Sequence, residues 1–187
     1  MDLYSEKKIY MILMFLVLAG ALNWGIVGVC SFNLIEHLDQ ITDKFKISKL
    51  VYIVIGLASL FLITKRDVYL PFLGDAVYPC DSLQEHIPND HTEKTKVQVP
   101  PYAVVVYWAA EPETETMKHE SNPLVAYQKY QNSGVVKADE NGEAILKFRK
   151  PQEYTVPSGK KLKPHVHYRY CKYPGMLSPV YTKKVCD

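Results

Sequence analysis

The chain has 187 residues, of which 22 are Lys or Arg and 20 are Asp or Glu, so its formal net charge is +2 at pH 7. A charge so close to zero creates no long-range field that would attract a polyanion, which argues against nucleic-acid binding. Composition changes along the chain, because residues up to Arg66 are rich in Ile, Leu, Val and Met, whereas Pro, Tyr, Lys and Glu dominate afterwards. The sequence therefore predicts an apolar N-terminal part and a soluble part long enough for one modest core.

Two apolar segments in the N-terminal part have the character of membrane helices. The 27 residues 9–35 contain no charged side chain, and about 20 helical residues suffice to cross a hydrocarbon core of about 30 Å. The second segment, 50–64, has 15 residues and extends to Ile47 if Lys49 reaches the interface with its ammonium group. Residues 1–66 are therefore predicted to form two transmembrane helices in a multi-pass integral membrane protein whose first partner is the lipid bilayer.

Other interpretations of the first apolar segment stay open. Two lysines, a short apolar run and the small residues 19–21 resemble a signal peptide with its cleavage site, although the apolar run continues well beyond them. A buried helical hairpin of a soluble protein would show a polar stripe with a 3.6-residue period, and none is visible in residues 9–29. Small residues such as Gly20 and Gly25 let helices approach closely, which predicts a tight helical hairpin and possible self-association through the same surfaces.

The N-terminal part resembles a family of small two-helix membrane proteins of unknown function. A Leu-Asn-Trp-Gly motif at residues 22–25 and a Phe-Asn-Leu element at residues 32–34 carry this resemblance. The second helix of that family opens with a tyrosine and has a Gly-Leu-Ala core, which correspond here to Tyr52 and residues 56–58. The resemblance ends near residue 80 and implies a topology without implying a reaction.

The soluble part is predicted to be a linker followed by strands. Residues 67–99, above all after residue 80, combine prolines and charges with no apolar period, which is typical of a linker or arm. Beyond it, β-branched and aromatic runs such as 103–108 and 144–148 alternate with turn signals, including an Asn-Gly dipeptide that predicts a hairpin. Residues 100–187 are therefore predicted to form an all-β antiparallel sandwich after the membrane hairpin.

The cysteines limit the disulfides that can form. Cys30 lies in the first apolar segment, which leaves Cys80, Cys171 and Cys186 in the soluble part, and three cysteines cannot all pair within one chain. Whether Cys171 pairs with Cys80 or with Cys186 stays open. No Cys-x-x-Cys motif supports a zinc ribbon or a thioredoxin-like site. The absence of an Asn-x-Ser/Thr sequon slightly favours a soluble part on the cytosolic side of the membrane.

The pair His165 and His167 is the strongest chemical signal in the chain. Residues i and i+2 of a strand point to the same face of a sheet, so the two imidazoles can bind one metal ion. Arg169 shares this face, which is expected to be wet or metal-bearing. The alternate positions, which we expect to face the core, are Val166, Tyr168 and Tyr170. Surface or hydrogen-bonded imidazoles are the alternative interpretation of the pair.

Tyr154 adds a third candidate ligand, because it lies between two prolines and precedes His165 by 11 positions. This pattern resembles the intradiol ring-cleavage dioxygenases, whose β-sandwich carries a Pro-x-x-Tyr-x-x-Pro segment followed by Arg-Pro-Ala-His-x-His. The segments 104–109 and 139–148 are also similar to strands of that family. The resemblance implies an Fe(III) cofactor with Tyr154, His165 and His167 as three of its four ligands, and zinc is a looser alternative for such donors.

The chain departs from that family at two positions. The first tyrosine ligand would be Tyr127 or Tyr130 here, because the segment after the opening strand is shorter, and Tyr130 is our candidate. Lys163 stands in place of the arginine that precedes the His motif, and a lysine lacks the planar guanidinium that orients an aromatic diolate. Lys163 is accordingly the candidate catalytic, substrate-orienting residue of an enzyme, while the short loops leave little chain to enclose a substrate.

Two functions are compatible with these patterns. The protein is first expected to be structural, with the helices anchoring it and the sandwich docking onto capsid-like proteins, as in a minor capsid protein that tethers the shell of a large DNA virus to an internal virion membrane. Such a tether would need no cofactor. The alternative is a membrane-bound ferric dioxygenase of intradiol type that acts on a catechol-like substrate.

Overall fold

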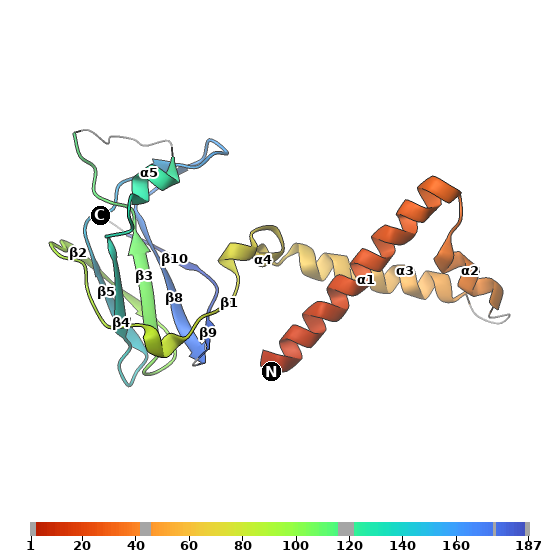
Figure 1. Cartoon of the computed structure of the whole chain (residues 1–187), viewed down its shortest axis with the longest axis horizontal. Helices are drawn as coiled ribbons and strands as arrows, with labels where there is room; N and C mark the ends of the chain where they lie inside the picture. The colour runs from red at the N-terminus through yellow and green to blue at the C-terminus, as the bar shows by residue number, and fades with distance from the viewer. Residues whose placement is uncertain (1–2, 42–45, 116–121, 174, 186–187) are drawn as a thin grey trace. The chain divides into compact units, whose positions relative to one another are not determined.

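The chain folds into a helical unit and a β-rich unit (Figure 1). The computed structural model describes residues 3–41, 46–115, 122–173 and 175–185. The boundary between the two compact units lies between Pro71 and Phe72. A helical N-terminal region followed by an antiparallel β-sheet region, as predicted, is therefore confirmed.

The described part of the helical unit contains α1 (Leu3–Cys30), α2 (Leu34–Ile41), α3 (Ile47–Ile63) and α4 (Arg66–Tyr69). Within α1, the 24 residues Lys7–Cys30 are long and apolar enough to cross a membrane. Only 11% of the most apolar stretch of this helix is buried, whereas the core helix of a soluble protein is mostly buried. Helix α3 is apolar but has 17 residues. Among the described residues, one possible membrane span is thus confirmed, whereas a second span stays a prediction.

A polar network centred on two asparagines joins the helices of this unit. The Asn23 side chain on α1 is only 3% exposed. Its amide nitrogen donates to Asn33 Oδ1 at 3.0 Å, and its carbonyl oxygen accepts from the first backbone N–H of α2, that of Leu34, at 2.9 Å. Asn33 in turn donates to the Tyr52 hydroxyl on α3 at 2.7 Å. Three helices are therefore joined through side chains that have no other way to be satisfied in an apolar setting.

Asn23→Ala is expected to destabilise the helical unit by about 1–2 kcal/mol, because it leaves the α2 N–H groups and Asn33 without their buried partner. Helicity can be measured as a function of SDS fraction in mixed micelles of the full-length protein. The control is Ser59→Ala, since the Ser59 hydroxyl bonds to the Ile55 carbonyl of its own helix. Equal midpoints for the two variants would show that the network does not hold the helices together.

The β-rich unit contains a six-stranded sheet and two small two-stranded sheets, and every strand pair in them is antiparallel. The large sheet has the order β1-β9-β8-β3-β4, and β10 also pairs with β8. Its strands are β1 (Ala76–Val77), β9 (Met176–Leu177), β8 (His165–Tyr173), β3 (Val104–Ala109), β4 (Ser133–Lys137) and β10 (Tyr181–Lys184). The small sheets pair β2 (Glu93–Gln98) with β5 (Glu143–Phe148), and β6 (Tyr154–Thr155) with β7 (Lys161–Leu162). Short helical turns are η1 (Pro71–Leu73), η2 (Cys80–Ser82) and α5 (Pro123–Tyr127).

One apolar core is formed by inward-facing side chains from β2, β3, β5 and β8. Its fully buried members include Val105, Tyr107, Leu146, Phe148 and Val166. Val166 is therefore in the core, as the alternation along β8 predicts, and Tyr168 and Tyr170 pack against it while partly buried.

The opposite face of β8 is expected to be wet or metal-bearing, and it is not wet at His165 and Arg169, which are both buried. Arg169 contacts the start of the β-rich unit, residues 72–82, which we call the entry segment. Its guanidinium donates to the carbonyl oxygens of Phe72 at 2.6 Å and Gly74 at 2.9 Å. The polar side chains of this face are thus buried by connecting segments, which strand alternation does not reveal.

The prediction that residues 67–99 form a linker is wrong for part of this segment. Strand β2 pairs with β5 in continuous register from Glu93↔Phe148 to Gln98↔Glu143. The sequence pattern does not indicate this strand, because its exposed positions are two lysines and a glutamine and only Val97 is buried, which is typical of an edge strand protected against aggregation. Within the same segment, Cys80 forms a disulfide with Cys171. Cys186, the other candidate partner, lies outside the described residues.

Burial of Tyr107 makes the β-rich unit sensitive to alkali. Its hydroxyl donates to the Lys147 carbonyl at 2.7 Å, and burial raises the pKa of Tyr107 to about 12. A raised pKa means that this tyrosine contributes its full stabilisation below pH 10 and loses about 1.4 kcal/mol per pH unit between about pH 10 and 12. Tyr107→Phe is expected to make stability fall less steeply in that window, as measured by urea unfolding from pH 9 to 12, with exposed Tyr102→Phe as the control.

Candidate metal centre

Four side-chain donor atoms converge at one end of β8. The Tyr154 hydroxyl lies 3.1 Å from His165 Nε2, and His165 Nε2 lies 3.1 Å from His167 Nε2. The Tyr127 hydroxyl lies 3.1 Å from the Tyr154 hydroxyl and 3.4 Å from His165 Nε2. Two phenols and two imidazoles therefore meet at a single point, although they come from three separate segments of the chain. We call these four residues the Tyr/His cluster.

Local structure brings each member of the cluster to this point. His165 and His167 stand at i and i+2 of β8, as the spacing predicts. Tyr154 is held in β6, which pairs with β7 through Tyr154↔Leu162. Tyr127 ends α5, a short helix that begins with a proline and is capped by the Asn122 side chain, which accepts from the Leu124 N–H at 2.9 Å.

Hydrogen bonds outside the cluster orient both imidazoles. His165 Nδ1 lies 2.6 Å from the Lys163 carbonyl oxygen. Since a carbonyl can only accept, Nδ1 carries the proton and the lone pair of Nε2 points at Tyr154. His167 Nδ1 lies 2.9 Å from the Thr182 hydroxyl on β10, which can accept a proton from it or donate one to it. This arrangement is the outer hydrogen bonding that metal-binding histidines use to fix their ring orientation.

Burial favours the neutral forms of three members of the cluster. Tyr127, Tyr154 and His165 are all buried. Burial lowers the pKa of His165 in spite of its bond to the Lys163 carbonyl, and burial raises the pKa of Tyr127 and of Tyr154. A bound cation would offset the cost of holding phenolates in this environment, so metal binding is expected to release protons.

The cluster fits a metal ion by donor type and by spacing. Donor atoms separated by 3.1–3.4 Å are at the separation expected of neighbouring ligands that share one ion at about 2.0–2.1 Å. Phenolate oxygen and imidazole nitrogen suit ferric iron. No group of three or more His, Cys, Asp or Glu that could hold a metal occurs in the described part of the chain, so this site depends on its two tyrosines.

Two candidate residues from the sequence lie outside the cluster. Tyr130 is 47% exposed, and its ring stacks on that of Tyr127 at a centroid distance of 5.3 Å. The structure therefore brings Tyr127 to the donor set in place of Tyr130. Lys163 contributes its backbone carbonyl to His165, while the residue itself is exposed.

Thr182 is a residue that the sequence does not single out, because only the register of β10, with Thr182 opposite His167, places it at the site. Thr182→Val keeps the side-chain shape and removes the hydroxyl, so the affinity for Fe(III) is expected to fall by about 10–100-fold. Thr182→Ser restores the hydroxyl and should restore most of this affinity. Iron titration followed by visible absorbance measures the effect, and equal affinities of the valine variant and the parent protein would contradict it.

Comparison with known proteins gives a match for the helical part. Residues 7–65 match a family described as a domain of unknown function, DUF378. This agrees with the resemblance to small membrane proteins in the same region, and it assigns no activity. No curated protein matches the chain.

Eight solved chains match in structure. One of them is the crystal structure of 3-chlorocatechol 1,2-dioxygenase from Rhodococcus opacus 1CP, with a TM-score of 0.32 and 16% sequence identity. The match covers 52% of this chain and 47% of that one, so the chain spans about half the length of the enzyme it matches. A TM-score this low does not establish a shared fold.

Proposed function

We propose that the protein is a membrane-anchored metalloprotein that binds ferric iron through Tyr127, Tyr154, His165 and His167. The observation that carries this proposal is the convergence of the four donor atoms, each within 3.4 Å of a neighbour. The hydrogen bonds at Nδ1 of both imidazoles also support it, because they leave the two Nε2 atoms directed at the other donors.

The proposed anchor is a hairpin of two transmembrane helices, α1 and α3, which a β-sandwich follows in the chain. Close packing supports the hairpin, since a Cβ added at Gly20 on α1 would lie 3.0 Å from Ile55 on α3. The shared core of the β2–β5 pair and the large sheet supports the sandwich.

The reaction that suits this donor set is an intradiol-type oxygenation of a catechol-like substrate. Bound ferric iron would supply the Lewis acidity that draws a catecholate to the site. The protein's own contribution would be to bury the tyrosines, to fix the imidazole orientation through Lys163 and Thr182, and to orient the substrate with the exposed Lys163 ammonium.

Expression of the full-length protein with iron, followed by metal analysis and visible spectroscopy, tests this function. We expect about one iron per chain and a visible tyrosinate-to-iron charge-transfer band that shifts when catechol is added. His165→Ala/His167→Ala should abolish the band and any oxygen uptake with catechol. A parent protein that stays colourless and iron-free would count against the metal centre.

A second candidate function is structural, and the exposure of Lys163 favours it, because an enzyme would direct its substrate-orienting cation into an enclosed site. In this proposal the sandwich docks onto capsid-like proteins through exposed aromatic residues such as Tyr102 and Tyr181, as a minor capsid protein of a virion with an internal membrane would. Replacing both histidines should then leave membrane attachment and particle assembly intact. Loss of assembly in that variant would speak against a purely structural role.

A further inference from the structure

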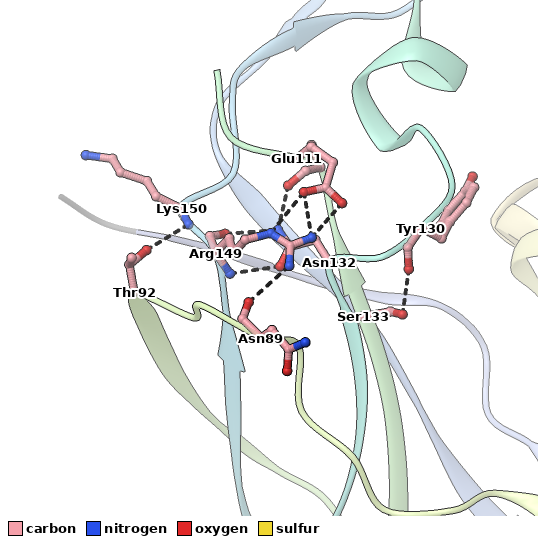
Figure 2. A network of polar contacts seen from close by, with 9 residues as sticks. Asn89, Thr92, Glu111, Tyr130, Asn132, Ser133, Arg149 and Lys150 are labelled. Carbon is pink, nitrogen blue, oxygen red and sulfur yellow. Dashed lines mark hydrogen bonds and ion pairs between the residues drawn. The ribbon is translucent and has the colours of Figure 1, made fainter. Parts of the chain in front are cut away.

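A largely buried ion pair joins Arg149 to Glu111, a neighbour of the segments that carry the two tyrosines of the Tyr/His cluster. Arg149, at the end of β5, donates through Nη2 to both carboxylate oxygens of Glu111, at 2.8 and 2.7 Å, and through Nε at 3.1 Å (Figure 2). The side chains are only 9% exposed for Glu111 and 19% for Arg149. Their charges are therefore withdrawn from water, which is costly unless the geometry is well satisfied.

Glu111 also connects the segments that carry the two tyrosines. Its backbone N–H donates to the Ala126 carbonyl at 2.8 Å, directly before Tyr127. Its backbone carbonyl accepts from the Gln152 N–H at 3.2 Å, two residues before Tyr154. One residue thus contacts both tyrosine-bearing segments through its backbone.

Two asparagine residues also help to hold the ion pair in place. Asn132, which is fully buried, donates to the Ala110 carbonyl at 2.7 Å and the Arg149 carbonyl at 3.0 Å, and its oxygen accepts from the Arg149 N–H at 2.8 Å. Arg149 Nη1 donates to the Asn89 carbonyl at 3.1 Å. Figure 2 shows these contacts gathered around the guanidinium. Asn132 therefore ties together the residues that flank β3, β4 and β5 beside Glu111.

We propose that the Glu111–Arg149 pair is a positioning element that holds Tyr127 and Tyr154 at the separation needed to bind one metal ion together. The inference rests on the proposed iron site and adds two residues to it that never touch the metal. A planar guanidinium fixes a carboxylate in two directions at once, which a lysine or an apolar contact cannot do. Stability alone would not require the pair, since well-packed apolar residues often replace a buried ion pair without loss.

The test is the double variant Glu111→Leu/Arg149→Met of the full-length protein in detergent. Removing both charges together avoids a lone buried charge, so the variant is expected to fold. We expect the affinity for Fe(III) to fall by about 10-fold or more and the tyrosinate-to-iron band to move, as for other outer-shell partners. The matched control is Lys96→Gln/Glu143→Gln, which removes an exposed ion pair of the β2–β5 sheet and should leave affinity and band unchanged.

A metal-free measurement separates this inference from the iron site itself. With ¹³Cζ-labelled tyrosine, the NMR signals of Tyr127 and Tyr154 should move in the double variant and stay in place in the control. If the parent protein binds no iron, the proposed function fails while these signals still decide the positioning role. Unchanged tyrosine signals, or an iron affinity and band equal to those of the parent protein, would overturn the positioning role. An Arg149→Lys variant that behaves like the parent would also overturn it.

Discussion

At the proposed iron site, Tyr127→Phe is expected to weaken and shift the visible band, which would then come from Tyr154 alone, and to lower the iron affinity by more than about 100-fold, because losing a ligand costs more than losing a hydrogen-bond partner of a ligand. Phenylalanine keeps the ring that packs beside Tyr154, in edge contact at a centroid distance of 5.5 Å. The fold should therefore survive the substitution. Metal analysis and visible titration of the purified variant give the result directly.

Tyr130→Phe is the matched control, since the two tyrosines are three positions apart and their rings stack on each other. This variant should bind iron and absorb light like the parent protein, because the structure joins Tyr127 and not Tyr130 to the donor set. The reverse outcome, with loss of iron in Tyr130→Phe and retention in Tyr127→Phe, would show that the loop rearranges when metal binds. If both variants kept full affinity, no phenolate from this segment would be a ligand.

The pairing of the two histidines was predictable from the sequence, because it depends on regular spacing within one strand. His165 and His167 share a face because strand geometry has a period of two, and the structure places both where that period puts them. The proximity of Tyr154 to them followed from a family resemblance. The choice between Tyr127 and Tyr130 could not be predicted from the sequence. It depends on a five-residue helix and on the positive φ of Gln128 and Tyr130 after it.

Features that depend on strand pairing were not predictable. Thr182 reaches His167 only through the register between β10 and β8. Strand β2 lacks an apolar period because it buries a single residue, Val97, and so its charges looked like those of a linker. The Glu111–Arg149 pair joins residues 38 positions apart whose only sequence signal is their charge. In each case the information resides in long-range contacts, which local patterns do not encode.

Removal of the Cys80–Cys171 disulfide is expected to cost the β-rich unit about 2–5 kcal/mol of stability. The bond closes a loop with a sequence separation of 91, and the entropy that a crosslink removes from the unfolded chain grows with loop length. It joins the entry segment, through η2, to β8. Cys80→Ala/Cys171→Ala should therefore unfold at a clearly lower urea concentration than the parent protein.

Reduction of the parent protein should reproduce the effect of the double variant, because both open the same loop. Cys30→Ala serves as the control, since this exposed thiol is free and its removal should leave the unfolding midpoint unchanged. The Arg169 contacts to Phe72 and Gly74 hold the same entry segment without a covalent bond, so equal midpoints with and without reductant would mean that they suffice. A stabilisation of the expected size would instead show that the covalent link holds this segment more strongly than those hydrogen bonds do.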